Sequence, residues 1–121
     1  MPLRSQLFAG DARLEACLTD NAAHLLPGAQ GDHVGKVQTA LFLVDGISVD
    51  AAELNAELYG KSTAAAVLAY KKKRKIINQS YQTTEDDIVG KMTIASLDED
   101  VIREESQLTD FPLAPQRRSF V

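Results

Sequence analysis

The residues that could do chemistry in this sequence gather around a glycine–lysine pair that occurs twice. Gly60-Lys61-Ser62-Thr63 carries the lysine and the hydroxyl residues with which a phosphate-binding loop holds a nucleotide. That loop also needs a glycine five residues before Gly60, where this chain has Asn55. The second copy, Gly90-Lys91-Met92-Thr93, has methionine where the first has serine. We therefore expect a helix-opening turn at both places and no nucleotide site.

The other chemically capable groups lack the spacing that catalysis or metal binding requires. Asp86 and Asp87 are adjacent acids, which usually point apart and are solvated or cap a turn. His24 and His33 do not have the spacing of a metal site, and Cys17 is the single cysteine. The sequence thus predicts no catalytic residue, no metal site, no cofactor and no intrachain disulfide. One alternative is a hydrolase whose catalytic residues are distant in the sequence and come together only in the folded protein.

A run of five cations occupies residues 71–75. Cations at the C-terminal end of a helix complement the helix dipole, so we expect a solvated helix end here. The alternative is a contact with an anionic partner, such as an acidic polymer or a charged protein face. The formal net charge of −4 argues against nucleic acid, because a phosphate backbone requires basic surface.

Helices must position these groups, and apolar residues at helical spacing indicate where the helices lie. Thr63, Ala66, Val67 and Tyr70 fall on one helical face after the first turn. Residues that could cap the helix N-termini are Asp11, Asp32, Asp50 and either Ser62 or Thr63. We expect helices over about residues 11–18, 32–44, 50–58, 61–75 and 92–97, the last with a continuation to 105.

The length of 121 residues and the apolar fraction of 45% fit one globular, mainly helical domain. We expect an N-terminal arm and short helix at 1–30, a helical domain at 31–105 and a flexible tail at 106–121. Leu3, Leu7 and Phe8 of the arm would pack against the body. No apolar run is long enough to span a membrane, and the charged N-terminus does not read as a secretory signal peptide.

Three stretches in this order resemble the peptidoglycan-binding domain 1-like family. The segment 31–41, followed by Asp45-Gly46, is similar to the opening helix of that family. The segment 59–71 is similar to its central motif, Phe-Gly-x-x-Thr-x-x-Ala-Val-x-x-Phe-Gln, and 87–97 to its closing Gly-x-Val-Gly-x-x-Thr-x-x-x-Leu. The chain departs from these patterns at Tyr70-Lys71, at Asp87 and in the length of two loops, which are surface positions.

The resemblance implies a small orthogonal three-helix bundle of the peptidoglycan-binding type, here with an N-terminal helical extension. It also implies a bacterial protein that binds cell-wall peptidoglycan without cleaving it and targets an associated or fused enzyme or effector to the wall. A glycan-peptide ligand needs a shallow surface with an apolar floor and a few polar groups. We expect that surface around the two turns, formed by Tyr59, Lys61, Ser62, Tyr70, Asp87, Ile88 and Lys91.

In this hypothesis Tyr59 stacks on or covers the ligand, and Lys61 and Lys91 meet peptide carboxylates. Tyr70 lies on the core face and fits packing better. The alternative hypothesis is a protein-interaction adaptor that keeps the fold without wall binding and docks an effector or a secretion-machinery protein. An exposed apolar patch on the arm or on residues 47–58 would favour it. The expected location is the periplasm or cell wall if a signal-less route exports the chain, and otherwise the cytoplasm.

Overall fold

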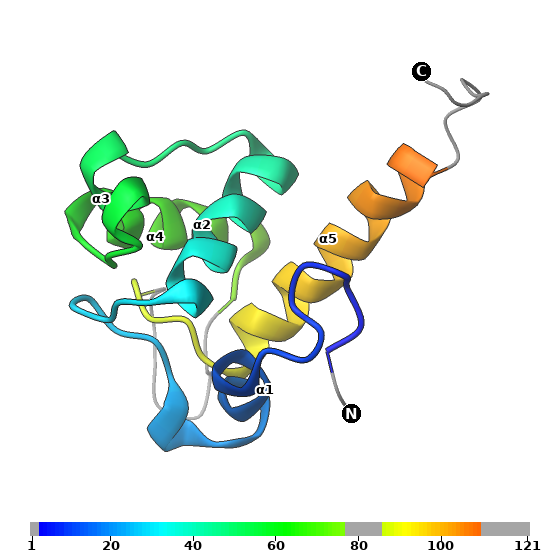
Figure 1. Ribbon diagram of the computed structural model, residues 1–121, viewed down its shortest axis with the longest axis horizontal. Coiled ribbons are helices and arrows are strands. Elements are labelled where there is room, and N and C mark those ends of the chain that lie inside the picture. Colours follow the sequence, from blue (N-terminus) through cyan, green and yellow to red (C-terminus); the bar gives the residue numbers. More distant parts are fainter. Residues whose placement is uncertain (1–2, 77–85, 110–121) are drawn as a thin grey trace.

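The computed structural model describes residues 3–76 and 86–109, and within them the chain is mainly helical. Figure 1 shows α5 running obliquely from the middle of the molecule to one end, with the other helices around its first half. In order, the elements are α1 (Ala12–Thr19), the short 3₁₀ helix η1 (Asn21–Ala23), α2 (Asp32–Asp45), α3 (Ala51–Ala56), α4 (Lys61–Arg74) and α5 (Lys91–Thr109). The predicted all-helical class is confirmed. The finer prediction of an orthogonal three-helix bundle stays a prediction.

Local signals explain most helix ends. Asp11 caps α1 as predicted, because its side chain accepts hydrogen bonds from the amides of Arg13 and Leu14. Gly46 adopts a left-handed conformation and ends α2, which also matches the prediction. The predicted cap at Asp32 is wrong. The cap residue is Gly31 at φ 136°, a conformation that favours glycine, and Asp32 already belongs to the helix.

Two other predicted boundaries differ. Helix α3 stops at Ala56 rather than at 58, because Glu57 turns to φ 52° and reverses the chain. Asp50 stands at its cap position, but its side chain makes no capping hydrogen bond. Helix α5 continues through Thr109 and so extends into the stretch predicted as a tail. The rest of that tail, and residues 77–85 between α4 and α5, lie outside the described residues.

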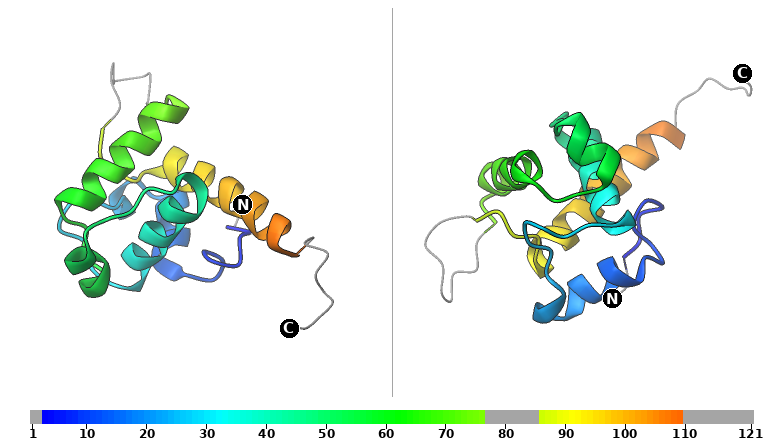
Figure 2. Two further views of the ribbon diagram at one scale, coloured as in Figure 1. Left: turned by 90° about the horizontal axis from the view of Figure 1, so that it is seen from above. Right: turned by 60° about the vertical axis from the view of Figure 1, so that its left-hand side comes forward.

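One hydrophobic core joins the N-terminal part of the chain to the remainder. Helices α1 and α2 both contact α5, and α2 also contacts α4 (Figure 2). Many of the core residues are aliphatic and carry no polar group, so their burial supplies the main favourable term in folding. The buried apolar side chains include Leu14, Cys17, Leu25, Val34, Val37, Leu41, Tyr59, Val67, Tyr70, Val89, Ile94, Leu97 and Val101.

The N-terminal arm is part of this core. Leu3 and Phe8 are 4% and 0% exposed, and Leu7 packs against the cluster, as predicted. Residues 5–10 of the arm form consecutive turns. No described helix has both the length and the apolar character that crossing a membrane would demand.

Carboxylates of α5 hold the backbone of the arm. Asp98 accepts from the amides of residues 4 and 5, both at 2.9 Å, and is itself buried. About two helical turns after Asp98, Glu105 accepts hydrogen bonds from the amides of residues 6 and 7 at 2.9 and 3.1 Å. Glu15 of α1 accepts from the amide of Leu3 at 3.0 Å. These contacts fix the arm along α5 through main-chain groups.

Candidate functional site

Both glycine–lysine turns stand at helix entrances, as predicted. Gly60 is the cap residue of α4, and the amide of Ala64 donates to its carbonyl at 2.9 Å. Gly90 precedes α5, and the amide of Ile94 donates to its carbonyl at the same distance. Thr63 and Thr93 take equivalent places, since each follows its glycine by three residues and is buried. The sequence repeat is therefore also a repeat of local structure.

The segment 25–30 holds both turns together. Leu25 and Val89 exchange two backbone hydrogen bonds of 3.0 Å just before the second turn. Tyr59 donates to the carbonyl of Ala29 and accepts from the amide of Gly28, both at 2.8 Å, just before the first turn. Because an extended chain advances about 3.3 Å per residue, Leu25 and Ala29 lie within roughly 13 Å of each other. The two helix entrances are thus neighbours.

Leu26, Lys61, Lys91 and Met92 lie within three residues of these backbone pairs and have exposed side chains. Lys61 and Lys91 open the two helices and are exposed. Leu26 and Met92 are large apolar side chains that are 49% and 52% exposed. We call Leu26, Lys61, Lys91 and Met92 the double-turn surface. It offers two ammonium groups and two exposed apolar side chains, which suits a ligand with carboxylates and an apolar body.

The structure removes two tyrosines from the predicted ligand surface. Tyr59 is 1% exposed, so it cannot stack on a ligand from this position. Its hydroxyl donates to the backbone carbonyl of Asp87, and burial raises its pKa above the ordinary value. Tyr70 is 0% exposed and belongs to the core. The proposed ligand role of Tyr59 is corrected to that of a core residue that fixes the segment before the second turn.

The other three predicted residues, Ser62, Asp87 and Ile88, are half-buried. The hydroxyl of Ser62 and the backbone carbonyls of Asp87 and Ile88 accept hydrogen bonds from within the fold. Ser62 accepts from the amide of Asp50 through its hydroxyl at 2.9 Å. The backbone carbonyls of Asp87 and Ile88 accept from Tyr59 and Lys71, respectively. Of the seven predicted residues, only Lys61 and Lys91 have exposed side chains.

Sequence reasoning missed Glu53 of α3, which is the group that caps α4. Its carboxylate accepts from the amides of Gly60, Ser62 and Thr63 at 3.1, 2.9 and 2.8 Å. It also accepts from the hydroxyl of Thr63 at 2.7 Å, so the predicted capping by Ser62 or Thr63 is wrong. Partial burial alone would raise the pKa of the Glu53 carboxyl, but these donors lower it to about 2.

No short-range pattern marks Glu53, because it lies on a different helix from the turn that it caps. A capping box would place the acid three residues after the cap, inside the same helix. Beneath this contact, the side-chain amide of Gln38 donates to the hydroxyl of Thr63 at 2.9 Å and to the carbonyl of Leu58 at 3.1 Å. Helices α2, α3 and α4 are therefore joined at the first turn.

The cation run is more strongly paired than predicted. Lys71 is buried and donates to Asp86 and to the carbonyl of Ile88 at 2.7 Å. Asp86 therefore forms an ion pair with Lys71 that joins α4 to the segment before α5. Only part of the run, Lys72, Lys73 and Lys75, is exposed. The prediction of a solvated helix end is wrong for Lys71, which is 5% exposed.

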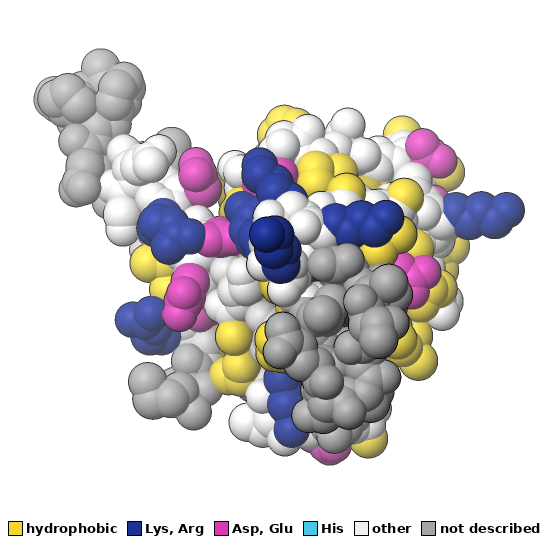
Figure 3. Space-filling model, turned by 180° about the vertical axis from the view of Figure 1, so that it is seen from behind, with side chains coloured by type: hydrophobic (Ala, Val, Ile, Leu, Met, Phe, Trp, Pro, Cys, Tyr) yellow, Lys and Arg dark blue, Asp and Glu magenta, His cyan; other side chains and the backbone are white. Residues whose placement is uncertain are grey.

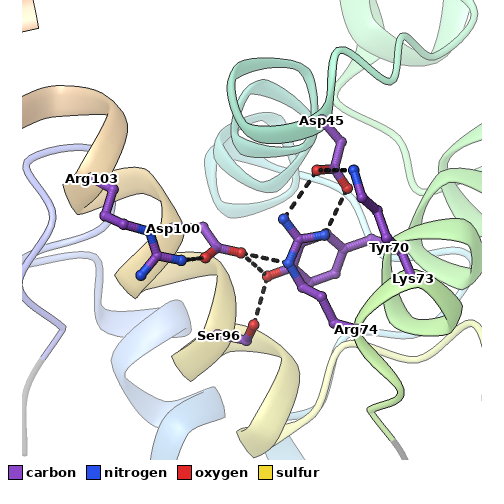
Figure 4. Close-up of polar contacts among 7 residues, drawn as sticks. All are labelled: Asp45, Tyr70, Lys73, Arg74, Ser96, Asp100 and Arg103. Atoms are coloured by element: carbon purple, nitrogen blue, oxygen red, sulfur yellow. Dashed lines mark hydrogen bonds and ion pairs between the residues drawn. The ribbon is translucent and has the colours of Figure 1, made fainter. Parts of the chain in front are cut away.

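Arg74, in the same run, joins α2, α4 and α5 (Figure 4). Its guanidinium donates to both oxygens of Asp45 at 2.9 and 3.0 Å, and its Nε donates to Asp100 at 2.8 Å. It lies 4.2 Å from the ring centroid of Tyr70, whose hydroxyl donates to Asp100 at 2.7 Å. Burial alone would lower the pKa of Arg74, but the bonds to Asp45 raise it. This cluster stabilises the packing of three helices.

Side chains suited to metal binding do not converge in residues 3–76 and 86–109. Within those ranges, no group of three His, Cys, Asp or Glu side chains could hold a metal ion. Cys17 is buried, and burial raises the pKa of its thiol to about 11. Burial also lowers the pKa of His33.

Comparisons with known proteins add no assignment. No protein-family model matches this chain, and no match was found among curated proteins or among solved structures.

Proposed function

We propose that this chain is a non-catalytic module that binds bacterial peptidoglycan and targets an associated or fused effector or enzyme to the cell wall. The ligand lies on the double-turn surface. Lys61 and Lys91 contact carboxylates of the peptide stems, and Leu26 and Met92 contact the apolar parts of the polymer. The bound polymer keeps the module at the wall, either in the periplasm or after signal-less export.

One observation carries this proposal. The three stretches that resemble the peptidoglycan-binding family form the start of α2, the entrance of α4 and the entrance of α5, and the segment 25–30 brings the two entrances together. The exposed side chains left at these entrances are cations beside large apolar groups. Cations beside apolar surface are the groups that a polymer with carboxylate-bearing peptides requires.

A pull-down with insoluble peptidoglycan sacculi tests the proposal. The wild type should sediment with sacculi at low and moderate salt, and a Lys61→Ala, Lys91→Ala variant should sediment at least about fivefold less, since both removed groups are exposed cations. A Lys72→Ala, Lys75→Ala variant is the matched control, because it loses the same charge elsewhere. Wild-type protein that stays in the supernatant at low salt would refute wall binding.

A second candidate function is the protein-interaction adaptor. Leu54, in the segment that sequence reasoning singled out for such a patch, is 45% exposed, and Phe42 and Leu43 of α2 are 59% and 39% exposed. Helix α3 has no buried residue, so Leu54 has not been drawn into the core. A photo-crosslinking residue at Phe42 should give one discrete protein adduct in cells that express the chain. Equal adducts from the same residue at Ala12, which is exposed on α1, would contradict the adaptor.

A further inference from the structure

Helix α4 has an outward face that sequence and structure both leave positive. Between Glu57 and Glu85 the sequence contains no acidic residue, although the whole chain has a net charge of −4. On the inner side of α4, Lys71 and Arg74 are neutralised by acids of neighbouring segments. On the outer side, Lys72 and Lys75 are exposed and make no ion pair within the described part of the chain.

The outward face follows the helical register as far as Lys72. Ala65, Leu68, Ala69 and Lys72 fall on the side of α4 opposite to the buried stripe of Thr63 and Tyr70. Lys75 is the exposed left-handed residue that ends the helix, three residues after Lys72. We call these five residues the α4 face. Figure 3 shows Lys and Arg side chains gathered over α4, with hydrophobic side chains between them. Lys61 opens the same register and also belongs to the double-turn surface.

The shape of the α4 face favours close approach of a second helix. Ala65 and Ala69 are exposed and extend only to their β-carbons, while Leu68 is half-buried between them. Small side chains at the contact allow two helix axes to approach to about 8 Å. The two lysines lie at the C-terminal end of this small-residue surface, where they reach acidic side chains of a partner that packs on the alanines.

The side chains of the α4 face indicate which class of partner it could bind. No aromatic side chain is exposed on it, so it lacks the platform on which sugars or bases stack. Two lysines on a chain with net charge −4 give too little basic surface for a nucleic acid. Charge complementarity and the small apolar centre fit one occupant best. We propose that the α4 face binds an acidic, amphipathic helix of a partner protein.

This contact is independent of wall binding and uses other residues. A single helix–helix contact buries less area than a stable complex requires, so we expect a dissociation constant in the micromolar range or weaker. Because exposed charges contribute to the contact, affinity falls as salt is raised. A module of this kind could sit on the wall through the double-turn surface and hold an effector through the α4 face.

The test uses a fluorescent helical peptide of about 20 residues, built from Glu, Ala and Leu with the acids along one side of an alanine stripe, which is long enough to form a helix alone. Titration into the full chain should give saturable binding by fluorescence anisotropy. Amide shifts in ¹H–¹⁵N spectra should map to Ala65, Ala69 and Lys72. A peptide with Lys in place of Glu should not bind.

A Lys72→Glu, Lys75→Glu variant should bind the acidic peptide at least about tenfold more weakly, since two attractions become repulsions. An Arg4→Glu, Arg13→Glu variant has the same change in charge at exposed positions elsewhere and should bind like the wild type. A neutral Lys72→Gln, Lys75→Gln variant covers the case in which the charge reversal disturbs folding, and circular dichroism checks each variant.

Three outcomes would overturn the proposal. The first is no saturable binding of the peptide at several hundred micromolar. The second is equal loss of affinity in the control variant, which would mean that only net charge matters. The third is tighter binding of heparin or of phosphatidylglycerol vesicles through the same α4 amides, which would assign the face to an anionic polysaccharide or to a lipid surface. None of these results bears on the sacculus pull-down, so the two proposals fail separately.

Discussion

Replacing Glu53 by glutamine tests whether one carboxylate joins α3 to the first turn of α4. The charged group accepts from three backbone amides and one hydroxyl at 2.7–3.1 Å. A neutral amide has one acceptor oxygen and a donor that faces other donors, so it leaves about two of these bonds unmade. Because Glu53 is half-exposed, each is worth about 1 kcal/mol. We expect Glu53→Gln to lower the free energy of unfolding by about 2 kcal/mol at pH 7.

The pH dependence has a defined sign. Folding lowers the pKa of Glu53 from 4.5 to about 2. The stabilisation is therefore fully present above about pH 4.5 and is lost as the pH falls toward 2. The difference in unfolding free energy between wild type and Glu53→Gln should narrow on acidification and reach about half of its neutral value by pH 3.

Urea unfolding followed by circular dichroism at 222 nm measures both effects. With a slope of about 1.5 kcal/mol per molar urea, a loss of 2 kcal/mol lowers the midpoint by roughly 1.3 M at pH 7. Glu99→Gln is the matched control, since Glu99 is exposed on α5 and accepts no hydrogen bond in the described structure. A Glu53→Gln midpoint within about 0.3 M of wild type, or a gap as large at pH 3 as at pH 7, would refute this account of the cap.

Three further predictions concern residues described above. Cys17 is fully buried with a thiol pKa of about 11, so the folded protein should react with a disulfide reagent at pH 8 at least about 100-fold more slowly than protein unfolded in urea. Tyr70→Phe removes the hydroxyl that donates to Asp100 at 2.7 Å, and should cost about 1–2 kcal/mol in urea unfolding; an unchanged midpoint would contradict this. In Gly60→Ala, the added β-carbon would lie 2.6 Å from the Glu53 carboxyl carbon and should cost about 1–2 kcal/mol. That cost should largely vanish in a Glu53→Ala background, and simple additivity of the two changes would argue against the clash.

The helices could be predicted from sequence wherever the signal is local. Asp11 caps its own helix, Gly46 ends α2 by turning left-handed, and the glycines of the two turns open α4 and α5. The apolar stripe of α2 is buried because its spacing matches the helical period. Each of these features depends on residues within one or two helical turns, so a single sequence contains the whole signal.

The candidate site was less accessible to sequence reasoning because its groups meet across the fold. The hydroxyl of Tyr59 bonds a carbonyl 28 positions away, and Arg74 meets Asp45 29 positions away. A tyrosine before a turn has a polar tip and an apolar body, so its type alone fits either a ligand surface or the core. Lys61 and Lys91 were found because the repeat itself places them at exposed first positions of helices.

The hold of α5 on the N-terminal arm has a consequence for how that segment tolerates variation. Asp98 and Glu105 accept hydrogen bonds from backbone N–H groups, which every amino acid except proline supplies. Arg4 and Gln6 have exposed side chains, so substitutions there by chemically unrelated residues should leave the position of the arm on α5 unchanged. A saturation library across residues 4–7 should be permissive at these two codons, with proline as the common exception.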